Sequence, residues 1–180
     1  MVMTLLSPRT LLPALTAIAM LIGAPRSAPL AAAGVDLTLM LVNLQTAKCL
    51  TIAGGVSSEN NVEALQFDCD NHPSRSWTLT SEGGDIYQVR NVQTGKCLTI
   101  AGGMSTDNNV AALQFDCDSH PSRRWHVVDV TGAGVYQIRN VETGKCLTIA
   151  GGVSTANNVT ALQFDCDSHQ SRRWTLRAKL

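Results

Sequence analysis

The octapeptide KCLTIAGG occurs three times in this chain of 180 residues, at Lys48–Gly55, Lys96–Gly103 and Lys145–Gly152. The cysteines of successive copies are 48 and 49 residues apart. A fixed period of about 20 to 50 residues is typical of folds built from several copies of one structural unit. The chain therefore contains three related units.

The similarity between the copies extends well beyond the octapeptide. Residues 87–125 and 136–174 differ at only six of 39 positions. The first copy diverges most at its start, where Leu39 stands in place of a tyrosine. We predict repeats at about residues 37–85, 86–134 and 135–180.

Each copy consists of short segments rich in strand-forming residues. IYQVRNV at 86–92 alternates apolar and polar residues, and CLTIA at 97–101 follows after the turn-forming sequence QTGK. No segment keeps a helical apolar period for the ten or so residues that a helix needs. Four short strands per copy give about twelve in all. Three copies are too few for a propeller of about 4 to 8 blades. We therefore predict an all-β fold in which the units close around a pseudo-threefold axis, which is a β-trefoil.

The first 33 residues differ from the repeats. Arg9 precedes an apolar run, LLPALTAIAMLIGA at 11–24, and three alanines at 31–33 offer the small residues that signal peptidase recognises. The run is shorter than the roughly 20 residues of a membrane-spanning helix. We interpret residues 1–33 as a signal peptide, so that residues 34–180 form a secreted, extracellular domain.

The charges of the chain are balanced and scattered along it. Fourteen lysines and arginines are matched by fourteen acidic residues, with no basic block. Nucleic-acid binding and membrane insertion are therefore not expected. We expect a monomer with no cofactor.

The arrangement of motifs resembles the ricin-B-type lectin repeat. Each copy has KCLTIAGG, then a loop that ends in Asn-Asn-Val, then LQFDC, then a polar loop that closes on tryptophan. The resemblance covers about residues 37–180. It implies a β-trefoil in which each unit can carry a shallow sugar-binding pocket, and binding of glycans or polysaccharide without catalysis. The alternative is a β-trefoil with degenerate sugar sites that binds a protein, as an inhibitor or as the delivery component of a toxin.

The six cysteines occur as pairs with a separation of 20 residues in every copy. Six cysteines allow fifteen connectivities, and the repeat favours the one that treats all units alike. In an exported protein this predicts one disulfide within each unit: Cys49–Cys69, Cys97–Cys117 and Cys146–Cys166. The second cysteine also begins a C-x-x-H sequence of the kind found in zinc sites, but a structural zinc needs four ligands, and we expect no metal.

Three tryptophans close the units, Trp77, Trp125 and Trp174. In the family this residue ends a Gln-x-Trp motif and its indole lies in the core, so we expect a structural role. Arg75, Arg123 and Arg172 stand in place of the glutamine. A guanidinium is able to bond backbone carbonyls, as the glutamine would.

The resemblance also points to candidate carbohydrate-binding residues. Two residues before the second cysteine, family members place an aromatic ring that stacks on a sugar; the alternative is a buried strand residue. Here the position is phenylalanine. Two residues after the first cysteine the family usually has an aspartate, and this chain has threonine, which lacks the paired acceptor oxygens of a carboxylate. An aspartate and a histidine in each polar loop are further candidates, with a solvated turn as the alternative. The candidates are Thr51, Phe67, Asp70 and His72; Thr99, Phe115, Asp118 and His120; and Thr148, Phe164, Asp167 and His169.

Catalytic residues are not expected. The tripeptide Asp118-Ser119-His120 contains the residue types of a hydrolase triad, but sequence neighbours rarely have the required spatial arrangement. The first copy has Asn71 at the position of the serine. We therefore predict a protein that is not an enzyme.

Overall fold

The computed structural model describes residues 36–179. The predicted signal peptide, residues 1–33, lies outside this part. Within it, twelve strands and three 3-10 helices form three successive sets, each with the order strand, strand, strand, 3-10 helix, strand. The first set is β1 (Asp36–Asn43), β2 (Cys49–Ile52), β3 (Ala64–Phe67), η1 (Pro73–Arg75) and β4 (Ser76–Gly83). The second is β5 (Ile86–Asn91), β6 (Cys97–Ile100), β7 (Ala112–Phe115), η2 (Pro121–Arg123) and β8 (Arg124–Asp129). The third is β9 (Val135–Asn140), β10 (Cys146–Ile149), β11 (Val159–Phe164), η3 (Gln170–Arg172) and β12 (Trp174–Ala178).

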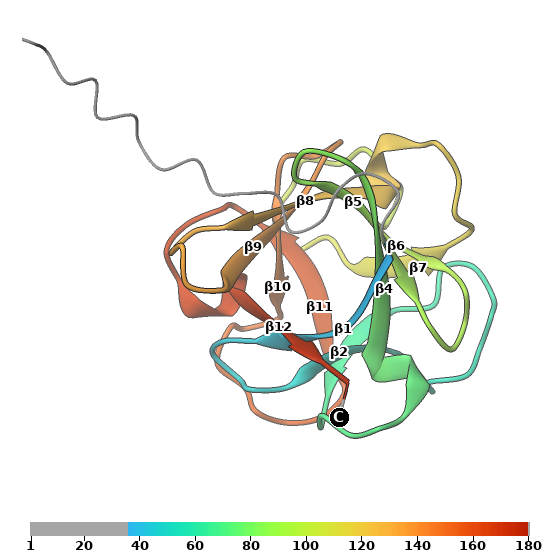
Figure 1. Ribbon diagram of the computed structural model, residues 1–180, viewed down its shortest axis with the longest axis horizontal. Coiled ribbons are helices and arrows are strands. Elements are labelled where there is room, and N and C mark those ends of the chain that lie inside the picture. The colour runs from blue at the N-terminus through green and yellow to red at the C-terminus, as the bar shows by residue number, and fades with distance from the viewer. Residues whose placement is uncertain (1–35, 180) are drawn as a thin grey trace, which may run out of the picture.

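The first and the fourth strand of each set, the outer strands, form a closed barrel. Each pairs antiparallel with the next in the cycle β1, β4, β5, β8, β9 and β12, and β12 pairs with β1 to complete it. Figure 1 shows the last strand, β12, beside the first, β1. Closure leaves this barrel without free edges.

The inner strands of each set form hairpins: β2–β3, β6–β7 and β10–β11. The hairpins contact one another, because β11 pairs with β3 and single bridges join Glu63 to Leu113 and Ala111 to Leu162. Three hairpins linked in this way beside a six-stranded barrel are a β-trefoil. The predicted fold is confirmed.

The tryptophans form the centre of the core. Trp77, Trp125 and Trp174 are fully buried and belong to one apolar cluster. Each indole N–H donates to a carbonyl of its own unit, at 2.9–3.0 Å, so that burial leaves no donor unpaired. This position in the core is the one expected for a structural role. No helix among the described residues is long and apolar enough to span a membrane.

The three predicted disulfides are present, Cys49–Cys69, Cys97–Cys117 and Cys146–Cys166, and the described residues include no free cysteine. Each bond joins the start of the second strand of a unit to the loop after its third strand. A metal cannot use these sulfurs while they are bonded to each other.

Each unit also holds a loop of the unit before it. The buried side chain of Gln114 donates to the carbonyls of Ser57 and Glu59 at 2.7 Å, and Asn60 donates to Asp116 at 2.8 Å. The same contacts recur from the second unit to the third and from the third to the first. The inter-unit contacts therefore form a closed cycle.

Acid is expected to weaken this cycle. The pKa of Asp68 is lowered by hydrogen bonds from Asn157 and Lys48, that of Asp116 by Lys96 and Asn60, and that of Asp165 by Asn108 and Lys145. Because these pKa values are lower in the folded state, their stabilisation is complete above the ordinary value of 3.8 and is lost as pH falls through the folded values.

The melting temperature is therefore expected to fall from pH 5 to pH 2. The triple variant Asp68→Asn, Asp116→Asn and Asp165→Asn is expected to show a smaller fall in melting temperature over the same pH range. Equal slopes for the two proteins would show that these carboxylates contribute nothing.

Candidate functional site

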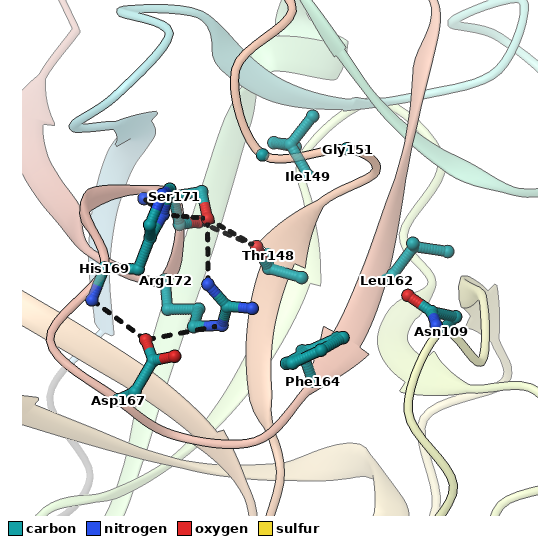
Figure 2. A pocket seen from close by; sticks show the side chains of 11 residues that line it. Asn109, Thr148, Ile149, Gly151, Leu162, Phe164, Asp167, His169, Ser171 and Arg172 are labelled. Atoms are coloured by element: carbon teal, nitrogen blue, oxygen red, sulfur yellow. Dashed lines mark hydrogen bonds and ion pairs between the residues drawn. The ribbon is translucent and has the colours of Figure 1, made fainter.

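Three pockets lie at equivalent places, one in each unit. Their volumes are about 290, 250 and 400 Å³ in the first, second and third units. These values are at or near the lower end of the range for small-ligand sites, about 300–1,000 Å³. Each is lined by the threonine, glycines, phenylalanine, histidine and arginine of its own unit. Figure 2 shows the third pocket.

Each pocket is completed by an asparagine from the preceding unit in the cycle. Asn158 of the third unit lines the first pocket, Asn61 the second and Asn109 the third. These residues have φ of 64–67°, a left-handed conformation that asparagine tolerates better than most residues. Sequence analysis missed them as site residues. The available signal was the recurring Asn-Asn-Val, but its neighbour across the unit boundary follows only from the closed fold.

The threonines lie at the base of the pockets and are almost fully buried, at 2–3% exposure. The hydroxyl of Thr51 donates to Ser74 Oγ at 3.0 Å, and Thr99 and Thr148 make the same contact with Ser122 and Ser171. These hydroxyls therefore position the serine and offer a ligand little surface. As carbohydrate-binding residues the threonines stay a prediction.

The histidines cap the 3-10 helices. His72 Nδ1 accepts from the backbone N–H of Ser74 at 3.2 Å and lies 2.9 Å from Ser74 Oγ. Gly55, at φ 74°, lies so close that an added Cβ would be 3.2 Å from Ser74 Oγ. The second glycine of KCLTIAGG is thus required by its backbone conformation and by this close approach. His120 and His169 make equivalent caps.

The serine that each histidine contacts in space is not the serine of the tripeptide Asp118-Ser119-His120. His120 contacts Ser122, two residues further on, and Ser122 is fully buried. Its hydroxyl oxygen accepts from Thr99 and Arg123. A buried hydroxyl that receives two donors serves as a structural junction and is out of reach of a substrate.

The aspartates form the turn that was considered as the alternative to ligand binding. Asp70 Oδ1 accepts from the backbone N–H of His72 at 2.9 Å and lies 3.3 Å from Arg75 Nε. The other units repeat both contacts. Asp167 lines the third pocket as well. Its role toward a ligand is untested.

The phenylalanines are partly exposed and lie outside the buried core clusters. A guanidinium lies over each ring: Arg75 over Phe67, Arg123 over Phe115 and Arg172 over Phe164, with the guanidinium carbon 4.2–4.5 Å from the ring centroid. One face of each ring is therefore already occupied by a cation. Stacking of a sugar remains a prediction, with the other face and the ring edge as its surfaces.

The arginines do not act as the glutamine was expected to act. Arg75 bonds Ser74 Oγ at 2.7 Å and faces Asp70, and no hydrogen bond joins it to a backbone carbonyl among the described residues. Arg124, one residue after the equivalent arginine of the second unit, bonds the carbonyls of Asp118 and His120 instead. The guanidinium lies instead in the pocket, over the ring of Phe67.

Comparison with protein families decides the relationship. The model of the ricin-type β-trefoil lectin domain-like family matches residues 33–116, 76–164 and 121–179. The chain belongs to this family. The overlapping matches reflect its repeats. A comparison with curated protein sequences gave no match.

Several solved structures are similar to this domain. The designed threefold-symmetric protein ThreeFoil has a TM-score of 0.74 and 20% identity, over 78% of this chain and 98% of that one. The Rhizoctonia solani agglutinin has a TM-score of 0.67 and 18% identity, over 86% and 99%. An exo-β-1,3-galactanase from Clostridium thermocellum has a TM-score of 0.72 and 23% identity, over 78% of this chain and 30% of the enzyme. At these identities the likeness establishes the fold.

Proposed function

We propose that the protein is a secreted carbohydrate-binding module that recognises glycans or polysaccharide through up to three repeat-related sites, without catalysis. The observation that carries this proposal is the presence of three equivalent pockets, each with a partly exposed aromatic ring and a set of polar side chains, in a lectin-like family. The disulfides are compatible with an extracellular location.

The pockets are shallow, so each alone is expected to bind weakly. Several pockets that engage one polymer at once raise the overall affinity by about 100-fold or more over a single site. Retention on an insoluble polysaccharide should therefore depend on the number of intact pockets.

The test is a series of phenylalanine-to-alanine variants. Changing one of Phe67, Phe115 and Phe164 is expected to reduce retention modestly, and changing all three is expected to abolish it. A matched control replaces Leu44, Val92 and Val141, equivalent apolar residues that do not line the pockets, with alanine. Circular dichroism should report a folded domain for both triple variants.

Two outcomes would contradict the proposal. Loss of retention by the control as large as that of the phenylalanine variant would separate binding from the pockets. Failure of the unmodified protein to bind any glycan on an array would favour the alternative, a β-trefoil that binds a protein.

A further inference from the structure

The polar groups that face the first and second pockets are mainly hydrogen-bond donors, and the third pocket adds the carboxylate of Asp167. In the first unit the donors are the guanidinium of Arg75, the imidazole of His72 and the side-chain NH2 of Asn158, whose amide oxygen is an acceptor. Thr51 also lines this pocket, but it is 2% exposed and its hydroxyl donates to Ser74. A ligand in this pocket therefore meets more donors than acceptors.

The histidine contributes a donor because of its cap. The backbone N–H of Ser74 donates to His72 Nδ1, so the hydrogen-bond pattern assigns the ring proton to Nε2. Nε2 has no hydrogen-bond partner among the described residues. The same assignment follows for His120 and His169.

The arginine is held by three contacts, and two of its nitrogens, Nε and Nη2, make no hydrogen bond. Nη1 of Arg75 donates to Ser74 Oγ, Nε faces Asp70, and Phe67 lies beneath the guanidinium. The arginine side chain is only 10% exposed, yet Nη2 has no hydrogen-bond partner in residues 36–179. Figure 2 shows the equivalent nitrogen of Arg172 pointing away from Ser171 and Asp167, toward the space between Thr148 and Phe164.

The nearby carboxylate does not cancel this charge within the pocket. Asp70 lies at the Nε side of the guanidinium, its Oδ1 already accepts from a backbone N–H, and its side chain is 48% exposed. Solvent therefore screens this ion pair.

We propose that the three pockets bind sugars that carry an anionic group, a carboxylate or a sulfate, at Nη2 of Arg75, Arg123 and Arg172. An anionic oxygen only accepts hydrogen bonds, which matches a pocket rich in donors, and a charge-assisted bond is about twice as strong as a neutral one. This inference rests on the proposed function and specifies the class of sugar.

The test compares acidic polysaccharides with their neutral counterparts at low and high salt. Polygalacturonic acid is paired with its carboxyl-reduced form, and chondroitin sulfate with chondroitin, which separates carboxylate from sulfate recognition. We expect at least tenfold stronger retention of the protein on one acidic polysaccharide than on its neutral counterpart. This retention should become weaker as the salt concentration rises. Because the net charge of the full chain is zero, bulk attraction to a polyanion does not account for such a preference.

Four variants locate the effect. Arginine to glutamine at 75, 123 and 172 is expected to lower acidic binding at least tenfold, whereas arginine to lysine should retain part of it. The matched control removes the same charge outside the pockets, with glutamine at Arg90, Arg139 and Arg177, and should change retention by less than twofold. The triple change Asp70→Asn, Asp118→Asn and Asp167→Asn removes the opposing charge. It is expected to strengthen binding of the acidic polysaccharide several-fold, which tests the proposal even if the glutamine variant fails to fold.

The outcomes distinguish the two proposals. Equal retention on acidic and neutral forms would overturn the anionic specificity and leave carbohydrate binding intact. Equal losses in the pocket and control variants would also overturn it, because they would reveal non-specific charge attraction. Binding to none of the polysaccharides, and to no glycan on an array, would overturn both.

Discussion

Reduction of the three disulfides is expected to unfold the protein at room temperature. Each bond joins cysteines 20 residues apart, for which the chain-entropy model gives about 3 kcal/mol. Together they contribute about 9 kcal/mol, which is comparable with the total stability of a typical domain, about 5–15 kcal/mol. Circular dichroism with and without a reductant, and with thiol titration to confirm reduction, measures the effect.

A single bond provides the control for this experiment. The paired change of Cys97 and Cys117 to alanine is expected to cost about 3 kcal/mol in a urea unfolding curve and to leave the fold intact. A fully reduced protein that melts within a few degrees of the oxidised one would contradict the expectation.

Replacement of Trp125 by alanine is expected to destabilise the domain by about 4 kcal/mol, within the range for removing a large buried aromatic side chain. The side chain is fully buried among the apolar residues of the barrel. Its indole N–H also satisfies the buried carbonyl of Leu98, at 3.0 Å. The change therefore leaves both a cavity and an unpaired acceptor. Thermal and urea unfolding measure the loss.

Two further variants separate these contributions. Trp125→Phe keeps most of the volume but removes the donor, and is expected to cost about 2 kcal/mol because Leu98 keeps an unpaired carbonyl. Val92→Ala changes an exposed residue and should cost less than about 0.5 kcal/mol. A loss below 1 kcal/mol for Trp125→Ala would show that this tryptophan is not central to the core.

The repeat explains why so much of the fold could be predicted. Three nearly identical copies make it simplest to treat equivalent residues alike, so Cys97 and Cys117 pair within a unit and Trp125 has two counterparts. Alternation of apolar and polar residues is a local property that indicates strands directly. These features need no knowledge of how the units meet.

The site was less predictable because it depends on contacts that only the folded chain creates. Asn158 enters the first pocket because the ring of units closes, and the local sequence around Thr51 contains no sign of it. His72 reaches Ser74 because a 3-10 turn brings together residues two apart. The guanidinium of Arg75 lies over the ring of Phe67, eight residues earlier in the chain. This contact between two side chains depends on how the loop folds back.

The pairing of β12 with β1 has a consequence for how such a protein can evolve. An open array of repeats gains or loses a copy at its ends without disturbing the others. Here every copy is internal, because each lends an asparagine to the next pocket and receives one from the copy before. A fourth copy has no place in the circle, and a lone copy lacks the asparagine that completes its pocket. The copy number is therefore locked at three, and new specificity must arise by substitution within copies.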